Sequence, residues 1–234
     1  MVMPWLSYYV TTKAFIKREP SVQELGVDQW GNPAINPYIR ARLRNEAAAL
    51  EFVAQHSTIS VPQKVRLWEE NGLVYLRMSL IEGAIELASV DDSLMPDAIA
   101  KVTAELEKDI LPRLHGLPKT GRIGSSDLEL PFIPSRRFWR AKEDREWPMK
   151  TSSSYVFCHG DLSRNNILID PECFKIRAII DWESAGFYPE NWELPLWKAN
   201  SPQEKSEMVR RANERDVGFW EGMGTDGVGE QSHG

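Results

Sequence analysis

Cysteine is scarce in this sequence, which has two among its 234 residues, Cys158 and Cys173. Two cysteines are too few for a framework of disulfides. The N-terminus lacks a positively charged leader, and Pro4 interrupts its short apolar stretch, so no secretory signal is predicted. No apolar run is long enough to span a bilayer. We therefore expect a cytoplasmic protein, kept reduced, that has no membrane partner.

The sequence also lacks an excess of basic residues, because 28 lysines and arginines stand against 34 acidic residues and the net charge is -6. A protein that binds nucleic acid usually presents a basic face to the polyanion. The nearest basic cluster, Arg40, Arg42 and Arg44, follows a helical pattern and indicates a solvated helix face. No nucleic-acid partner is therefore expected, and the oligomeric state is left open.

The composition is otherwise that of a globular protein, with 42% hydrophobic and 26% charged residues. A chain of this length can bury a substantial core without disulfides. Its length suits either one large domain or two small lobes that share a cleft.

The first half of the chain favours a small sheet and one helix. Residues 5–18 are rich in aromatic and β-branched side chains and predict one or two strands, and further strands are predicted near 64–68 and at 73–81. Between them, apolar residues recur at helical spacing from Tyr38 onward. Several prolines and glycines in 19–37 indicate an irregular insertion.

The pattern changes near Pro96, where a long amphipathic helix is predicted to begin and to end at Pro112 and Gly116. The stretch 118–150 is polar and predicts loop, with a short helix around Phe138.

Short strands are then predicted at 155–158 and 167–169, with a turn leading to a third strand at 176–180. Together they predict one hairpin from Tyr155 to Trp182. A C-terminal helix is predicted over about 202–220.

Two segments carry the residues suited to chemistry, CHGDLSRNNILID and AIIDWESAGFYPENWE. In the first, Asp161 precedes Asn166 by five positions, and in the second Asp181 ends a strand rich in β-branched residues. Phosphoryl transfer from a nucleotide needs one carboxylate to orient the attacking hydroxyl, and an amide and a second carboxylate to hold Mg²⁺ against the phosphates. The spacing also matches the catalytic loop of protein kinases, His-x-Asp-x-x-x-x-Asn.

HGDLSRNNIL and IIDWESAGFYPENWE together resemble the aminoglycoside phosphotransferase-like, or choline-kinase-like, family, especially its fungal members. The resemblance covers roughly residues 13–200, and its specific part lies in 159–193. It implies ATP and Mg²⁺ as cofactors and a small-molecule hydroxyl as the acceptor. It also implies that Asp161 is the catalytic carboxylate and that Asn166 and Asp181 are the metal ligands.

The same resemblance extends to the first half of the chain. Lys17 in AFIK corresponds to the lysine that pairs with the α/β-phosphates, and Glu46 in RNEAAALEFV to the helix glutamate that orients it. Glu46 shares a helix face with the apolar Leu50, which favours an inward side chain. Residues 78–83 resemble the hinge that receives the adenine. His159 is expected to brace the catalytic loop.

The expected fold class is α+β, a protein-kinase-like fold of two lobes. A small antiparallel-sheet lobe is predicted at 1–83, a mainly helical lobe with the catalytic hairpin at 84–221, and a disordered tail at 222–234. No glycine precedes Gly26, although backbone that closely approaches phosphates normally contains glycine. The N-terminal lobe is therefore expected to be truncated by one or two strands.

Three functions remain open on the sequence. The first is an ATP- and Mg²⁺-dependent kinase. The second is an enzyme of the same fold whose Asp161 and Asp181 share a proton in an acidic cleft and catalyse a cyclisation or isomerisation. The third is a pseudokinase that acts as a binding module. The acceptor pocket is expected along 118–150 and at an aromatic-rich segment. The aromatic residues of that segment are Trp182, Phe187, Tyr188, Trp192 and Trp197.

Overall fold

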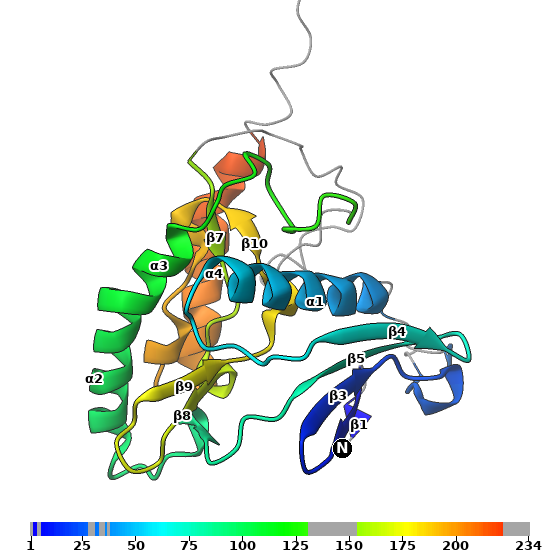
Figure 1. Cartoon of the computed structure of the whole chain (residues 1–234). Helices are drawn as coiled ribbons and strands as arrows, with labels where there is room; N and C mark the ends of the chain where they lie inside the picture. Colours follow the sequence, from blue (N-terminus) through cyan, green and yellow to red (C-terminus); the bar gives the residue numbers. More distant parts are fainter. Residues whose placement is uncertain are drawn as a thin grey trace, which may run out of the picture.

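The computed structural model describes most of the chain. The described residues are 2–3, 6–27, 31–32, 36, 38–130 and 154–221. They form a sheet lobe, which we define as β1–β5 with α1, and a helical lobe, which contains the remaining elements (Figure 1). The predicted helix around Phe138 and the predicted disordered tail lie outside the described residues. The predicted lobe boundary at residue 83 stays a prediction.

The sheet lobe is built on one antiparallel sheet with the strand order β1-β2-β3-β5-β4. Its strands are β1 (Val2–Met3), β2 (Leu6–Val10), β3 (Ala14–Arg18), β4 (Arg66–Glu70) and β5 (Leu73–Ser79). Two strands thus precede the end of β3, where Lys17 lies. The turn between β2 and β3 contains no glycine and is closed by Thr11, whose hydroxyl accepts a hydrogen bond from the Ala14 N–H at 3.0 Å.

Helix α1 (Ile39–His56) crosses the middle of the molecule and covers one face of the sheet (Figure 1). Leu43, Leu50 and Val53 are fully buried in the main hydrophobic core, as their helical spacing predicts. Glu46 lies among these apolar residues and is also fully buried, so the prediction of an inward glutamate is confirmed.

The first helix of the helical lobe differs from its prediction. Helix α2 (Met95–Glu105) continues through a π-helical turn (Leu106–Ile110) into α3 (Leu111–His115), so Pro112 does not end it. The wide turn interrupts the regular hydrogen-bond ladder, which places Pro112 in the first turn of a new segment, where its missing N–H costs little. Gly116 ends the helix, and its N–H bonds to the carbonyl of Pro112 at 3.0 Å.

The predicted single hairpin from Tyr155 to Trp182 is in fact divided between two small sheets. Strand β8 (Ile167–Ile169) lies between β6 (Ile85–Glu86) and β9 (Ile176–Ile179). Strand β7 (Val156–Cys158) pairs instead with β10 (Gly186–Tyr188), which follows the second motif. The two sheets together bring the loop before β8 next to the loop after β9.

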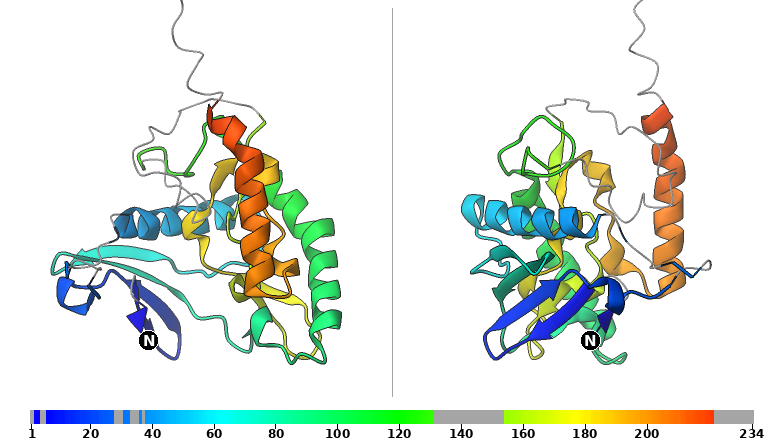
Figure 2. Two further views of the ribbon diagram at one scale, coloured as in Figure 1. Left: turned by 180° about the vertical axis from the view of Figure 1, so that it is seen from behind. Right: turned by 90° about the vertical axis from the view of Figure 1, so that its right-hand side faces the viewer.

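Helix α4 (Pro202–Glu221) runs along the outside of the helical lobe (Figure 2). Its Ala212, with Met208 and Val209, packs on Leu194 and Leu196 in a small cluster apart from the main core. No helix in the described part of the chain is long and apolar enough to cross a bilayer.

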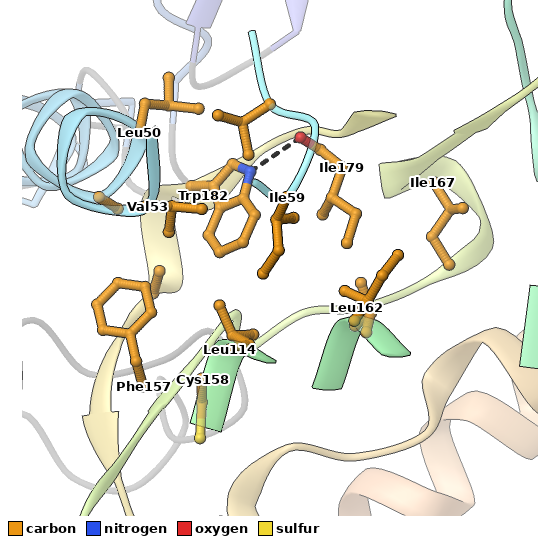
Figure 3. Packing of buried hydrophobic residues seen from close by; sticks show 14 of the residues in the cluster. Leu50, Val53, Ile59, Leu114, Phe157, Cys158, Leu162, Ile167, Ile179 and Trp182 are labelled. Atoms are coloured by element: carbon orange, nitrogen blue, oxygen red, sulfur yellow. Dashed lines mark hydrogen bonds between the residues drawn. The ribbon is translucent and has the colours of Figure 1, made fainter. Parts of the chain in front are cut away.

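One large core joins the two lobes, and Figure 3 shows its centre. Leu50 of α1, Phe157 of β7 and the indole of Trp182 are buried there together. The Trp182 indole N–H donates to the carbonyl of Ile179 at 2.9 Å. The five aromatic residues expected near the acceptor pocket are all at most 5% exposed, so they pack the core and do not form an open cage for a cation.

Candidate active site

Lys17 lies on the face of β3 that points toward α1. Its ammonium nitrogen is 2.8 Å from Oε1 and 2.7 Å from Oε2 of Glu46, and the two side chains are 5% and 0% exposed. The predicted ion pair between these two residues is therefore present. A buried pair with both carboxylate oxygens engaged is held in one arrangement, because neither charge can leave its partner without being stranded.

Asp181 brings the helical lobe to the same lysine. It follows β9 and has left-handed backbone angles, with φ 65° and ψ 55°. Its Oδ1 is 2.5 Å from Nζ of Lys17, and its side chain remains 25% exposed. One ammonium group therefore joins a carboxylate from each lobe, although Lys17 and Asp181 are separated by 164 positions in the sequence.

The protonation of this group follows from its surroundings. Burial opposes the charge of Lys17, but the carboxylates of Asp181 and Glu46 outweigh it and raise the pKa of Lys17 above its usual value. Burial also raises the pKa of Glu46, against the attraction of Lys17 and with a contribution from the charge of Asp181. The two carboxylates thus favour the charged form of Lys17 at this site.

Asn166 is held beside Asp181 by the backbone. The Ile180 N–H donates to the carbonyl of Asn166 at 2.9 Å, so Asn166 lies next to the residue that precedes Asp181. The Asn166 amide nitrogen donates to the carbonyl of Asp161 at 2.7 Å. The structure therefore brings Asp161, Asn166 and Asp181 together where the loop before β8 meets the loop after β9. The chemical roles of these three residues remain proposals.

His159 braces this region from within the core. It is fully buried, its Nε2 donates to the carbonyl of Ile180 at 2.9 Å, and its Nδ1 accepts from the Asp161 N–H at 3.3 Å. Burial lowers the pKa of His159, which favours the neutral ring that these two bonds require. The expectation that His159 supports the loop agrees with this geometry.

Glu193 supports the same loop, a contact that sequence reasoning did not include. Its carboxylate accepts the backbone N–H groups of His159 and Gly160, the latter at 3.3 Å. Gly160 itself has φ 81°, and a Cβ at this position would lie 2.5 Å from the carbonyl oxygen of Ser184. Glycine is therefore required where the two motif loops touch. Glu193 is the last residue of the second quoted motif, so a charged residue at that place was the sequence feature that could have indicated this contact.

Helix α1 is bonded to the segment that follows Asp181, and here one expectation was wrong. Arg42 is 2% exposed and lies 3.5 Å from Glu183, so it is not part of a solvated face. The Asn45 amide donates to the carbonyls of Glu183 and Ala185, each at 2.9 Å. Arg42 stands four residues before Glu46 on the same helix face, which is the signal that could have placed it inside.

Lys205 is a further side chain at the site, and it comes from α4. Its Nζ lies 3.1 Å from Oδ1 of Asp161, with exposures of 38% for the lysine and 19% for the aspartate. No sequence motif indicated it, because the contact joins residues 44 positions apart.

The donor set suits a magnesium ion rather than a transition metal. Among the described residues, no three His, Cys, Asp or Glu side chains gather as metal ligands. Mg²⁺ takes oxygen ligands, often one or two from the protein with water or phosphate completing the shell. The Asn166 amide nitrogen is used by Asp161, which leaves its oxygen for a cation, and Asp181 supplies a partly exposed carboxylate.

An open cavity of about 560 Å³ lies against the segment that resembles the hinge. It is lined by Leu80, Ile81 and Glu82 on one side and by Lys175 and Arg177 on the other. Neither Lys17 nor the motif carboxylates line it, so it is separate from the site described above.

Comparison with known proteins finds relatives among the aminoglycoside phosphotransferases. An aminoglycoside 3'-phosphotransferase of Streptomyces ribosidificus is 29% identical over 155 residues, which correspond to 59% of this chain and 58% of the relative. The matched region thus spans less than two thirds of that relative's length.

Solved structures show the fold. The GDP complex of aminoglycoside 2'-phosphotransferase-IIIa has a TM-score of 0.52 and 15% identity, covering 92% of this chain and 76% of the other. An aminoglycoside phosphotransferase of Streptomyces rimosus, in complex with ADP and streptomycin, has a TM-score of 0.50 and 16% identity, covering 89% and 85%. The fold is thus the kinase-like α+β fold of these enzymes. Residues 8–216 also match the family described as Phosphotransferase enzyme family. The chain therefore belongs to the phosphotransferase enzyme family.

Proposed function

We propose that this protein transfers the terminal phosphoryl group of a nucleoside triphosphate to a hydroxyl group of a small molecule. The observation that carries the proposal is the position of Lys17, a buried cation in contact with a carboxylate from each lobe. A buried lysine fixed by Glu46 is suited to bind phosphate oxygens. Family membership and the nucleotides bound by the two solved relatives support the same reaction.

Each residue then has a separate task. Lys17, oriented by Glu46, would bind phosphate oxygens of the nucleotide. Asn166 and Asp181 would hold Mg²⁺, which when bound neutralises negative charge on the phosphates. Asp161 would orient the acceptor hydroxyl and take its proton as the new bond to phosphorus forms.

The alternative in which two carboxylates share a proton receives no support from the geometry. Each carboxylate has its own ammonium partner, because Asp181 contacts Lys17 and Asp161 contacts Lys205. In a pair that shares a proton the two carboxylates contact each other, whereas here they are bonded to two different ammonium groups. The arrangement is therefore that of two anions with different roles.

The acceptor is proposed from the relatives. All three relatives reported above are aminoglycoside phosphotransferases by name, and one was solved with streptomycin. We propose a polyhydroxylated small molecule as the acceptor class.

The test is consumption of ATP or GTP by the purified protein in the presence of individual hydroxyl compounds, including kanamycin and streptomycin. Phosphorylated product is expected by mass spectrometry, with Mg²⁺ required and with Asp161→Asn inactive. The inactive variant is expected to melt like the wild type, since Asp161 is not needed by the core. Conversion of any substrate by wild-type protein in EDTA without nucleotide would contradict the proposal.

A further inference from the structure

We propose that Lys205 is a positioning residue for the reaction, acting through Asp161 from outside both motifs. This inference rests on the proposed function. The supporting contact is the 3.1 Å distance between Nζ of Lys205 and Oδ1 of Asp161. Within the part of the chain that the structure describes, it is the one ion pair formed by Asp161.

The start of α4 is fixed to the catalytic loop. Arg164 lies three positions after Asp161 in that loop. Its Nε donates to the carbonyl of Trp197 at 2.8 Å, and its Nη2 donates to Oδ1 of Asn200 at 3.2 Å. Trp197 is in turn bonded through its indole N–H to Thr103 at 3.0 Å. The loop that carries Asp161 therefore also places the segment that leads into α4.

The first turn of α4 is capped in a way that positions Lys205. Ser201 accepts the N–H of Glu204 through its hydroxyl at 3.1 Å, and the Glu204 carboxylate accepts the N–H of Asn200 at 2.7 Å. The Lys205 N–H donates to the carbonyl of Ser201 at 3.0 Å. These two bonds fix the start of the helix. Lys205 is thus presented to Asp161 by an ordered turn.

The chemistry of the pair suits a proton acceptor that must stay oriented. An ammonium group has three N–H donors, so Lys205 can fix the carboxylate of Asp161 through one of them and still has two donors for other acceptors. Because Lys205 binds one oxygen of Asp161, the other oxygen can face the proton of the acceptor hydroxyl. The acceptor oxygen then forms its bond to phosphorus while the bond to the nucleotide's bridging oxygen breaks. The proton passes to the second oxygen of Asp161.

The exposure of Lys205 separates this role from one in folding. Its side chain is 38% exposed, so truncation leaves no buried cavity. Exposed ion pairs contribute little to stability. Lys198 gives a matched control, because it lies in the segment that leads into α4, is 43% exposed, and pairs with Glu107 instead of Asp161.

The test compares wild-type protein with Lys205→Met, Lys205→Arg and Lys198→Met, with Mg·ATP as ligand and water as acceptor. Mg·ATP affinity is measured by calorimetry, and kcat and KM by release of inorganic phosphate. Misplacing a reacting group can cost about 100-fold in rate, so kcat of Lys205→Met is expected to fall by roughly 10- to 100-fold. Its KM, its affinity for Mg·ATP and its melting temperature should stay at wild-type values. Lys205→Arg should recover part of the rate, and Lys198→Met should be unchanged.

The outcomes distinguish this inference from the proposed function. A wild-type protein that neither binds Mg·ATP nor releases phosphate overturns both. Wild-type turnover with an unchanged kcat in Lys205→Met overturns the role of Lys205 alone. The same holds for an equal loss in Lys198→Met, or for a loss that comes with weaker binding and a lower melting temperature.

Discussion

The ammonium group of Lys17 lies 2.7 Å from Oε2 of Glu46 and 2.5 Å from Oδ1 of Asp181, and so links the helix of one lobe to the loop of the other. Because Glu46 is fully buried, its negative charge is stabilised by the ammonium group of Lys17 and not by water. Both the fold and the proposed phosphate site therefore depend on this one side chain.

We predict that Lys17→Met lowers the free energy of unfolding by about 3–5 kcal/mol, because it strands a buried carboxylate. Urea unfolding monitored by circular dichroism measures this change. Lys13→Met, at an exposed position just before the same strand, is the control and should unfold like the wild type. Equal unfolding midpoints for Lys17→Met and Lys13→Met would contradict the structure.

A second prediction concerns the three arginines of α1. Arg42 and Glu183 are both at most 3% exposed in their side chains, so Arg42→Met is expected to cost about 3 kcal/mol by removing the buried positive charge that faces Glu183. Arg44 is exposed on the same helix, so Arg44→Met should change stability by at most about 0.5 kcal/mol. If the two variants unfold alike, the original interpretation of a solvated basic face is correct.

The contact between the two motif loops can be tested at Gly160. Gly160→Ala combines a left-handed backbone with a Cβ placed 2.5 Å from the Ser184 oxygen, and we expect a loss of at least about 2 kcal/mol. Gly72 has a similar φ of 74°, and a Cβ added there would have no atom within 4 Å, so Gly72→Ala measures the backbone contribution alone. A thermal shift no larger for Gly160→Ala than for Gly72→Ala would show that the loops do not touch in this way.

Stability should also fall on acidification because of His159. Burial lowers the pKa of His159 in the folded state, whereas the unfolded chain has the ordinary value of about 6.5. Below a pH of about 6.5 the unfolded chain binds a proton at His159 that the folded protein does not bind. The free energy of unfolding is therefore unaffected by this histidine above that pH and decreases as the pH falls below it.

The comparison is wild type against His159→Asn, with unfolding free energies measured between pH of about 7.5 and 5.5. The wild type should lose stability more steeply, by up to about 1 kcal/mol per pH unit, whereas the variant is less stable throughout but flatter. Parallel curves for the two proteins would mean that His159 is not neutral in the fold.

Local patterns were sufficient to predict much of this site. The helical spacing of Glu46 with Leu50 indicated that the glutamate points inward, and the strand that ends at Asp181 was visible in its β-branched residues. Asp161 and Asn166 are close in sequence, so their proximity follows from one short loop.

Other features depend on contacts that a sequence pattern does not encode. The pairing of β7 with β10 instead of its chain neighbour β8 is a tertiary choice. The π-helical turn before Pro112 overrides the rule that proline ends a helix. Lys205 reaches Asp161 because Arg164 fixes the start of α4, and neither residue belongs to a helical or strand period that points to the site.

The most direct test of the proposed function is the Mg²⁺ dependence of nucleotide binding, measured by isothermal titration calorimetry. Wild-type protein should bind ATP or GTP in the presence of Mg²⁺ and lose most of that affinity in EDTA. Asp181→Asn should bind the nucleotide no better with Mg²⁺ than without it, because the variant lacks the charged ligand, while Asp92→Asn, at an exposed position, should bind like the wild type. Binding that is equally tight in EDTA, or an Asp181→Asn variant with wild-type Mg²⁺ dependence, would contradict the assignment.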